Sequence, residues 1–368
     1  MPRTSTIRAI AHALPATVLT YEDLAARFGE KHVASIYRMS GIRDRRVVAA
    51  GQCASDLAAA AARRLFGHCQ VDPSTIDAVI FASQTPDYRC PATACKLQGD
   101  LGLPEHCTAF DINQACASFV FALQAAHSMV VAATARRVLL LNGDAVSALA
   151  HPLDRALVPI VGDAATAALV EGCDAEAGGI EFFECGVAGK DFDKLIVPAG
   201  GARLPASAET AREETDEAGC VRSKDNMFMD GPAVFHFVLY KITDFLAQLL
   251  RRRNLSIDDF DLVLFHQAGK TMVDLLYKQL RVPAEKRFYY LEGVGNSSGA
   301  SLPSLLAEAW RAGKIQGGQR TLLCSFGGGL SWGAFSVRWP ADAAAAVPGD
   351  VDVPPPAASA PAASPDPN

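Results

Sequence analysis

Short runs of apolar residues alternate with longer amphipathic segments along most of the chain. Four runs have the length and near-continuous hydrophobicity of strands that are buried on both faces: AVIFA (78–82), RVLLLN (137–142), LVLFH (262–266) and TLLCSF (321–326). Other segments repeat their apolar residues with helical spacing, among them FVFALQAAHSMVVAA (119–133) and PSLLAEAWRAG (303–313). This alternation predicts an α/β fold in which helices cover both faces of the sheets.

Two segments of the first half have an echo in the second half. IDAVIFASQTP (76–86) resembles FDLVLFHQAGK (260–270) at an offset of 184 residues, and RRVLLLNGD (136–144) resembles QRTLLCSFG (319–327) at an offset of 183. Nearly equal offsets indicate duplicated halves, with a substrate site between them. We therefore divide the chain into an N-terminal half, a C-terminal half and a tail, at residues 1–178, 179–340 and 341–368.

Composition and charge narrow the classes of function. Half of the 368 residues are hydrophobic, a fifth are charged and the net charge is −6, so nothing favours nucleic acid as a partner. The longest basic run is the arginine triplet 251–253, and no apolar run reaches the length of a membrane span. The opening residues also lack a continuous secretory core. We expect a cytoplasmic protein that binds neither nucleic acid nor membrane.

The ten cysteines are scattered, with no CxxC pair and no Cys/His group at metal-ligand spacing. Most should be buried, reduced thiols, and no metal site is predicted. The tail, 341–368, holds almost only Ala, Pro, Asp, Val, Ser and Gly. Such a composition buries too little apolar surface to offset the entropy of ordering. We expect the tail to be disordered and to lie outside the fold.

Cys116 stands in DINQACASF (111–119), where a strand-like run passes into a helical pattern. A cysteine in the first turn of a helix faces unpaired N–H groups and the positive end of the helix dipole, which favour the reactive thiolate. Small neighbours would also let a substrate carbonyl approach the backbone. Taken alone, a cysteine in an apolar context is more often a core residue. Cys116 is therefore a candidate nucleophile that needs support from the rest of the chain.

Three further segments supply candidates. His266 ends an apolar strand, Asn296 lies in GVGNSSG, and SFGGGLSWG (325–333) is a glycine-rich turn. His266 alone could be a core histidine and Asn296 a turn residue. The glycine-rich turn lacks the GK[ST] and GxGxxG patterns of phosphate loops, so it is better explained as backbone N–H groups presented to an oxyanion. The offset of 183 relates Cys116 to position 299, close to Asn296, which brings these candidates to corresponding strand ends.

Six segments in a fixed order carry a family resemblance: GIRDRR (41–46), DINQACASF (111–119), DRALVPIVGDAATA (154–167), FHQAGK (265–270), VGNSSGASLP (294–303) and SFGGGLSWG (325–333). They resemble motifs of the β-ketoacyl-acyl carrier protein (ACP) synthase III family of thiolase-fold condensing enzymes, over about residues 5–340. The resemblance implies a thiolase-like α/β fold whose duplicated halves form a five-layered αβαβα sandwich. In it, the first half carries the nucleophilic Cys and the second half carries the His and the Asn.

By this resemblance Cys116 takes an acyl group from an acyl-CoA or acyl-ACP donor, and the N–H groups of Cys116 and Gly328 form the oxyanion hole. His266 and Asn296 would bind the carbonyl of malonyl-ACP or malonyl-CoA. As carbon dioxide leaves they would stabilise the enolate, which attacks the acyl-cysteine in a decarboxylative Claisen condensation. Phe326 would lie beside the thiol and keep water away. The family uses no metal or organic cofactor, works with ACP and is homodimeric, so the same is expected here.

Several positions depart from the family pattern. Ser35 and Met39 stand where a Trp and an Arg usually hold the adenine of coenzyme A, which leaves Arg38 and Arg155 as the candidate nucleotide contacts. Gly269 replaces the Asn of the family's HQAN motif. Coenzyme A as the donor's carrier is therefore less firmly implied than the chemistry at Cys116.

Two other segments bear on the substrate. The polar stretch 200–227 is longer than a priming synthase needs, and we expect it to form a cap over the entrance. QTPDYRCPATAC (84–95) resembles the loop that closes the partner's acyl pocket across the dimer, and Cys90 stands where acetyl-preferring members carry Phe. The smaller residue predicts a donor longer or bulkier than acetyl. A neighbour such as Tyr88 could instead refill the space.

Two alternatives to a condensing enzyme remain. The first is an acyltransferase that passes the Cys116 acyl group to a small-molecule hydroxyl or amine without forming a carbon–carbon bond. The second is a non-catalytic subunit of a heterodimeric synthase, which would be free to lose the site residues. Asn296 favours condensation, because an enolate needs two hydrogen-bond donors whereas simple transfer needs only the histidine base.

Overall fold

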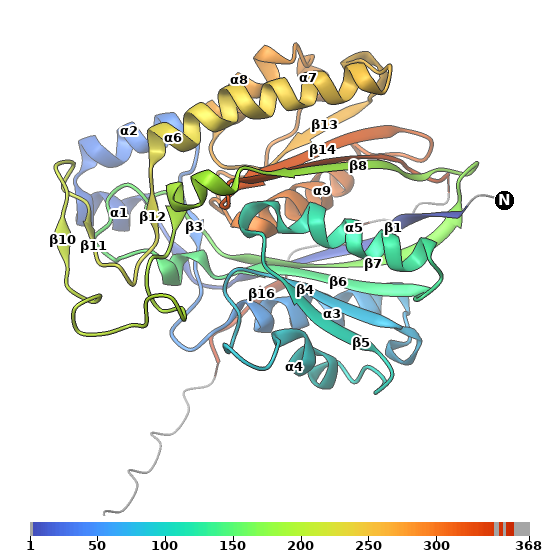
Figure 1. The fold of residues 1–368 in the computed structure, drawn as a ribbon, viewed down its shortest axis with the longest axis horizontal. Helices are drawn as coiled ribbons and strands as arrows, with labels where there is room; N and C mark the ends of the chain where they lie inside the picture. The colour runs from blue at the N-terminus through green and yellow to red at the C-terminus, as the bar shows by residue number, and fades with distance from the viewer. Residues whose placement is uncertain (1–2, 342–345, 349–350, 357–368) are drawn as a thin grey trace, which may run out of the picture.

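The computed structural model describes residues 3–341, 346–348 and 351–356, in which two β-sheets are stacked between layers of helices (Figure 1). The larger sheet has six strands in the order β16-β1-β7-β6-β4-β5. These strands are β1 (Arg3–Pro15), β4 (Ala78–Ala82), β5 (Thr108–Ile112), β6 (Arg137–Asp144), β7 (Ala164–Asp174) and β16 (Val351–Val353). β4 runs parallel to both β5 and β6, whereas β7 lies antiparallel between β1 and β6.

The smaller sheet has four strands in the order β13-β14-β15-β8. They are β8 (Gly179–Val187), β13 (Leu262–Phe265), β14 (Arg320–Gly327) and β15 (Ser331–Arg338). Every residue of β4 and of β13 is buried, as near-continuous apolar runs require. The four runs predicted to be buried strands are all strands, and they form β4, β6, β13 and β14.

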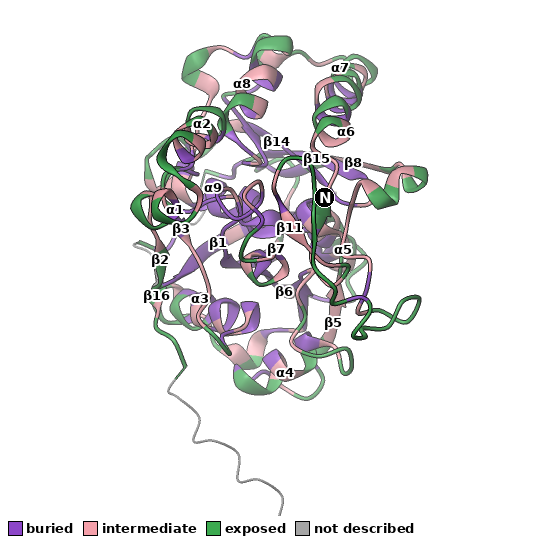
Figure 2. Cartoon of the chain, turned by 90° about the vertical axis from the view of Figure 1, so that its left-hand side faces the viewer, coloured by how far each residue is buried: buried purple, intermediate pink, exposed green. Residues whose placement is uncertain are grey.

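Helices make the other three layers of the sandwich. They are α3 (Ala54–Cys69), α4 (Thr93–Asp100), α5 (Ser118–Val131), α7 (Thr243–Arg252), α8 (Lys270–Gln279) and α9 (Ser301–Arg311). α5 and α9 share one apolar core with strands of both sheets, so they form the central layer. α3 and α4 pack on the outer face of the six-stranded sheet, and α7 and α8 pack on the outer face of the four-stranded sheet. The predicted αβαβα order is confirmed, and Figure 2 shows the exposed residues on the outer helix faces.

The two central helices begin in the same way. A 3-10 turn precedes each of them, Ala115–Ala117 before α5 and Ser298–Ala300 before α9. The first residue of each turn has a left-handed backbone, with φ of 44° at Ala115 and 51° at Ser298. These starts are related by the offset of 183 residues that the sequence predicts, so the duplication extends to the local geometry of the turns.

Within the part of the chain that the structure describes, one helical segment is long and apolar enough, by length and composition alone, to cross a membrane. It is Gly231–Arg252, which joins α6 (Gly231–His236), a π-helical turn (Phe237–Ile242) and α7. Its apolar face, with Val238, Leu246 and Leu249 fully or almost fully buried, packs on the four-stranded sheet. Part of the hydrophobicity of this segment is therefore used within the fold, whereas Phe235 and Tyr240 remain exposed.

Short elements gather at one end of the sheets (Figure 1). They are α1 (Tyr21–Phe28), α2 (Glu30–Ser40), β2 (Val18–Leu19), β3 (Arg45–Arg46), β9 (Leu195–Ile196), β10 (Glu214–Thr215), β11 (Val221–Arg222) and β12 (Phe228–Met229). The stretch predicted to form a cap, 200–227, contains the β10–β11 hairpin and lies between β9 and β12, which pair with each other.

The expectation that the whole tail lies outside the fold is wrong for the part that the structure describes. β16 adds a parallel strand to the edge of β1, with Val351 opposite Ala13 and Val353 opposite Pro15. The side-chain amide of Gln52 also donates to the Val353 carbonyl at 3.3 Å. Without β16, the backbone N–H and C=O groups along this edge of β1 would have no strand to pair with. The sequence Val-Asp-Val has the β-propensity to form such a short strand.

The segment between β15 and β16 makes a second contact with the sheet. Ala346 and Val347 are buried, and the Val347 N–H donates to the Ile10 carbonyl at 2.9 Å. The Ala/Pro-rich composition of the tail concealed these contacts, because only a few apolar residues make them. Residues 342–345, 349–350 and 357–368 of the predicted tail lie outside the described residues.

Deleting residues 342–368 should lower the free energy of unfolding by about 1–3 kcal/mol, because the deletion exposes the edge of β1 and removes the buried Val347. Denaturant titration of the two proteins measures this difference. Asp352→Asn is the matched control, since it keeps the strand and removes only an exposed ion pair with Arg46. Equal stability of the truncated and full-length proteins would mean that β16 contributes nothing.

Candidate active site

A cavity of about 160 Å³ lies between the two halves of the fold, and four residues singled out in the sequence line it: Cys116, His266, Asn296 and Phe326. Apolar side chains make much of the remaining wall, including Val146, Leu157, Val161, Met227, Met229, Phe237 and Val238. A mostly apolar wall with a few converging polar groups is typical of a small-molecule site.

Cys116 lies in the turn between β5 and α5 and is 8% exposed. Burial raises the pKa of its thiol to about 11. The Ser298 hydroxyl and the N–H groups of Cys116 and Gly328 act in the opposite direction, and the charge of Asp144 adds to the rise. The start of the helix therefore does not by itself make Cys116 a thiolate near neutral pH, because desolvation outweighs it in the free protein.

The glycine-rich turn between β14 and β15 lies directly against Cys116. A β-carbon at Gly327 would come within 2.6 Å of the Cys116 Cβ and 2.9 Å of its Sγ, so only glycine fits there. The next residue, Gly328, directs its N–H toward the thiol. The Ser331 hydroxyl donates to the Gly328 carbonyl at 2.7 Å and helps to hold the turn in place. Two backbone N–H groups, those of Cys116 and Gly328, thus converge beside the sulfur, where they can donate to the oxygen of a thioester that the sulfur attacks.

His266 follows the last residue of β13, and its N–H donates to the Cys324 carbonyl at 2.9 Å. Its ring meets that of Phe326 edge-on, with ring centroids 5.5 Å apart. Burial lowers the pKa of His266 to about 3, so the imidazole is neutral near neutral pH. Its Nδ1 has no hydrogen-bond partner among the described residues. A neutral imidazole that lines the cavity can donate a hydrogen bond there without changing its charge.

Asn296 is held by backbone contacts on both sides. Its N–H donates to the Ile160 carbonyl at 2.9 Å, and its own carbonyl accepts from the Gly162 N–H at 3.0 Å. Its side-chain Oδ1 accepts from the Ser298 N–H at 3.0 Å. Because Oδ1 is occupied in this way, the amide can offer its Nδ2 hydrogens to a ligand.

The structure adds three polar residues that sequence analysis missed, namely Gln84, Asp144 and Ser298. Asp144 lies at the carboxyl end of β6 and is fully buried, and burial raises its pKa to about 7. Gln84 lies just beyond β4, and Ser298 opens the turn before α9. The signal that could have found Gln84 and Asp144 is their position at the carboxyl ends of parallel strands, where open α/β folds gather their sites.

Other predicted site residues do not line the cavity around Cys116. Arg38 is exposed in the last turn of α2. Arg155 is half-buried, and its carbonyl lies 2.9 Å from the His32 Nε2. Cys90 and Tyr88 are exposed on the loop before α4. Of the residues singled out in the sequence, Cys116, His266, Asn296 and Phe326 therefore lie together at the glycine turn. The residues that lie outside this cavity are Arg38, Arg155, Cys90 and Tyr88.

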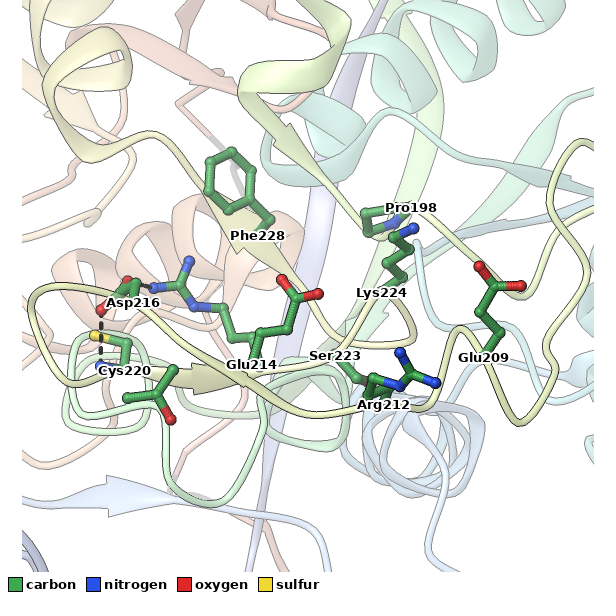
Figure 3. Close-up of a pocket in the computed structure, with 11 residues that line it drawn as sticks. Pro198, Glu209, Arg212, Glu214, Asp216, Cys220, Ser223, Lys224 and Phe228 are labelled. Atoms are coloured by element: carbon green, nitrogen blue, oxygen red, sulfur yellow. Dashed lines mark hydrogen bonds and ion pairs between the residues drawn. The ribbon is translucent and has the colours of Figure 1, made fainter.

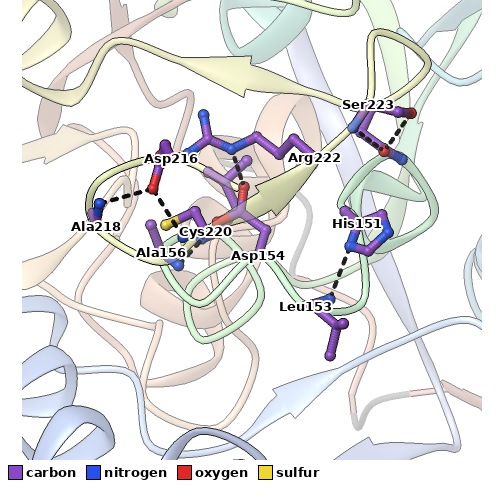
Figure 4. Close-up of polar contacts among 11 residues, drawn as sticks. His151, Leu153, Asp154, Ala156, Asp216, Ala218, Cys220, Arg222 and Ser223 are labelled. Atoms are coloured by element: carbon purple, nitrogen blue, oxygen red, sulfur yellow. Dashed lines mark hydrogen bonds and ion pairs between the residues drawn. The ribbon is translucent and has the colours of Figure 1, made fainter. Parts of the chain in front are cut away.

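A charged network joins the cap region to the loop that carries Arg155 (Figure 4). The Arg222 Nε pairs with Asp154 Oδ2 at 3.0 Å, and the same guanidinium pairs with Asp216. Asp154 is 1% exposed, and its Oδ1 accepts from the Leu157 N–H at 3.0 Å. Because the carboxylate is buried and shared, the β10–β11 hairpin is fixed against a loop whose Leu157 lines the cavity.

The cap also contains a second cavity of about 350 Å³ (Figure 3). Charges of both signs line it, with Arg212 and Lys224 facing the same space as Glu209 and Glu214. Elsewhere, the described residues include no group of three or more His, Cys, Asp or Glu that could hold a metal ion.

Two family models match the chain. The model for 3-oxoacyl-[acyl-carrier-protein] synthase III matches residues 110–189, and the model for its C-terminal part matches residues 250–339. The first match contains Cys116, and the second contains His266, Asn296 and the glycine turn.

Curated relatives match over most of their length. The β-ketoacyl-[acyl-carrier-protein] synthase III of Rhodopirellula baltica is 36% identical over 343 residues, covering 89% of this chain and 96% of the relative. That of Roseiflexus castenholzii is 37% identical over 331 residues, with the same coverage. The chain belongs to the β-ketoacyl-ACP synthase III family. The resemblance drawn from the six motifs is thereby confirmed.

Solved structures of the synthase III family agree with this assignment. A crystal structure of a 3-oxoacyl-(acyl-carrier-protein) synthase III superposes with a TM-score of 0.89 at 36% identity, covering 91% of this chain and 100% of that one. The synthase from Burkholderia xenovorans LB400 gives 0.84 at 31% identity, with 95% and 98% covered. The thiolase-like fold predicted from the motifs is therefore the fold of this chain.

Gly327→Ala should lower the rate of condensation by about 100-fold, because the new β-carbon displaces Cys116 or the oxyanion turn by a fraction of an ångström. Gly67→Ala is the matched control, since nothing lies within 4 Å of a β-carbon at that exposed helical position. Turnover of an acyl and a malonyl thioester measures both variants. Full activity of Gly327→Ala would contradict the tight fit of the glycine against the thiol.

Proposed function

We propose that the protein is a decarboxylating β-ketoacyl-ACP synthase of the synthase III type, with Cys116 as nucleophile and His266 and Asn296 as hydrogen-bond donors to the malonyl thioester. The observation that carries the proposal is that these three side chains line one cavity, with the N–H groups of Cys116 and Gly328 aimed at the sulfur. Such a constellation suits an acyl transfer followed by enolate chemistry.

In the first half-reaction the sulfur of Cys116 attacks the thioester carbonyl of an acyl-CoA or acyl-ACP. The carbonyl oxygen becomes an oxyanion that accepts hydrogen bonds from the N–H groups of Cys116 and Gly328. Collapse of the tetrahedral intermediate breaks the bond to the carrier's sulfur, and the proton of the Cys116 thiol leaves with the carrier as a free thiol. Phe326, 2% exposed and beside the cavity, helps to keep water from the acyl-cysteine.

In the second half-reaction the thioester carbonyl of malonyl-ACP or malonyl-CoA accepts hydrogen bonds from His266 and from the Asn296 Nδ2. Loss of carbon dioxide leaves an enolate, and the two donors stabilise its oxygen. The enolate carbon attacks the acyl carbonyl on Cys116, the new carbon–carbon bond forms, and the carbon–sulfur bond breaks to regenerate the Cys116 thiolate. Because burial lowers the pKa of His266 to about 3, the residue acts as a neutral donor throughout.

The acyltransferase alternative has no observation in its favour. Its chemistry needs a base near the thiol but gives no role to Asn296, whose Oδ1 is fixed by the Ser298 N–H. The non-catalytic alternative is equally unsupported, since a subunit without activity has no need of Cys116, His266 and Asn296 around one cavity.

We assign acyl-CoA or acyl-ACP as the donor, malonyl-ACP or malonyl-CoA as the extender and ACP as the carrier partner. Arg38 and Arg155 would contact the phosphates of the carrier; the Arg155 Nε has no hydrogen-bond partner among the described residues. A polyketide priming β-ketosynthase of the R1128 pathway is 26% identical, with a TM-score of 0.79. This similarity makes polyketide priming, beside fatty-acid initiation, a pathway to test.

We further propose a cytoplasmic homodimer. β5 is an edge strand of the six-stranded sheet, and its residues Thr108–Ile112 are exposed or half-buried although the sequence TAFDI suits a strand. Pairing of two copies through this edge would cover it and would bring the exposed loop around Cys90 toward the partner.

His266→Ala and Asn296→Ala should each self-acylate at Cys116 and should each lose at least about 100-fold in decarboxylation of the malonyl thioester, because one of two enolate donors is gone. Intact-mass spectrometry measures the fraction of enzyme acylated at Cys116, and the rate of carbon dioxide release measures decarboxylation of the malonyl thioester. Cys116→Ala is the control that forms no acyl-enzyme. Decarboxylation at the wild-type rate in both variants would favour the acyltransferase alternative.

Cys90→Phe should shift donor preference toward acetyl, whereas the wild type should acylate faster with a medium-chain thioester, because each buried methylene gains about 0.8 kcal/mol. Cys69→Phe is the control, since Cys69 ends α3 and lies outside the cavity. Acylation rates across a series of chain lengths measure the effect. A wild type that prefers acetyl, or an unchanged profile in the variant, would mean that Cys90 does not set the pocket.

A further inference from the structure

Gln84 and Ser298 form a hydrogen-bond chain that ends at the thiol of Cys116. The Gln84 Nε2 donates to the Ser298 Oγ at 2.6 Å, and the Ser298 Oγ lies 3.3 Å from the Cys116 Sγ. All three residues line the cavity. The reaction described above assigns no role to either Gln84 or Ser298.

The backbone fixes the position of the Ser298 hydroxyl. Ser298 is 2% exposed, its φ is 51°, and its N–H is bound to the Asn296 Oδ1 at 3.0 Å. Because the Oγ accepts a hydrogen from the Gln84 amide, its own hydrogen is free to be donated. The Cys116 sulfur and the Asp144 carboxylate both lie within hydrogen-bonding reach of the Ser298 hydroxyl.

Asp144 is already supplied with donors. It accepts from the Gln84 N–H at 2.8 Å, from the Gly299 N–H at 2.9 Å and from the Ser83 hydroxyl at 3.2 Å. The sulfur of Cys116 has fewer partners once a substrate is bound, because in the proposed reaction the carbonyl oxygen of the substrate takes the hydrogen bonds of the Cys116 and Gly328 N–H groups. The Ser298 hydroxyl is the donor that remains for the sulfur.

The charges around the thiol make this donor important. Asp144, at the end of β6, disfavours the thiolate of Cys116, and His266 lines the same cavity in its neutral form. No cationic side chain lines the cavity among the described residues. A thiolate at Cys116 is therefore stabilised by hydrogen bonds and not by an opposite charge.

We propose that the Ser298 hydroxyl donates to the Cys116 thiolate as it attacks the thioester and as it is expelled after condensation, and that Gln84 is a positioning residue that orients this hydroxyl. The inference rests on the proposed role of Cys116 as the nucleophile. It makes Ser298 a catalytic residue and assigns Gln84 a function exerted only through Ser298.

A measurement without substrate tests the hydrogen-bond chain from Gln84 through Ser298 to Cys116. Iodoacetamide alkylation of Cys116 is followed at several pH values by mass spectrometry of the peptide that contains it, in the wild type, Ser298→Ala, Gln84→Met and the double variant. Gln114→Met is the control, because it removes an amide two residues from Cys116 that makes no contact with Ser298 in the described hydrogen bonds.

We expect Ser298→Ala to alkylate about tenfold more slowly at pH 8, with its rate profile displaced to higher pH, since one donor to a charged group is lost. Gln84→Met should slow alkylation in the same direction by about threefold or more, and the double variant should equal Ser298→Ala. The control should react at the wild-type rate.

Three results would overturn the proposal. The first is an unchanged alkylation rate in Ser298→Ala, and the second is an unchanged rate in Gln84→Met. The third is a double variant whose loss is the full product of the single losses, which would mean that Gln84 acts independently of Ser298. Gln84→Leu serves as a second apolar variant, and thermal melting of each protein checks that it is folded. Because no thioester is used, failure here is distinct from failure of the proposed synthase activity.

Discussion

Helices α5 and α9 are enclosed between two sheets, and the position of the active site depends on that packing. Each helix is preceded by a turn with a left-handed residue, and the two turns contact each other in the middle of the molecule. One turn carries Cys116, and the other begins two residues after Asn296. Since both helices share an apolar core with strands of both sheets, neither can slide without disturbing its packing against both sheets. The packing of the core thus sets the distance between nucleophile and enolate donors.

Enclosure also decides the electrostatics of the site. It makes His266 neutral, raises the pKa of Cys116 to about 11 and raises the pKa of Asp144 to about 7. An isolated charge is destabilised in this buried site. Hydrogen bonds from oriented N–H and O–H groups are strong there, because water does not compete for them. The protein provides such donors, because the N–H of Gly328 and the hydroxyl of Ser298 both hydrogen-bond to the sulfur of Cys116. Preorganised dipoles, and not ion pairs, are the means by which this site stabilises a developing charge.

Prediction from the sequence succeeds where one feature repeats or where a pattern is tied to backbone geometry. The apolar runs gave the strands, and the offset of 183 residues related the Cys116 turn to the Ser298 turn. The residues that it missed share another property. Gln84 and Asp144 are unremarkable in sequence, and their roles follow from which strands lie side by side, an arrangement that exists only after folding. The strand β16 was not predicted for a related reason, because its partner β1 lies at the other end of the chain.

The pairing of β1 with β16 has a consequence for the order in which the protein is made. Ala13 pairs with Val351, so the six-stranded sheet unites segments that leave the ribosome at very different times. β1 must also wait for β7, although strands β4, β5 and β6 of the same sheet are synthesised in between. The N-terminal half therefore emerges with an open sheet edge that its own sequence cannot close. Translation speed through the second half, and chaperones that shield that edge meanwhile, will influence how much of the chain reaches the native sandwich.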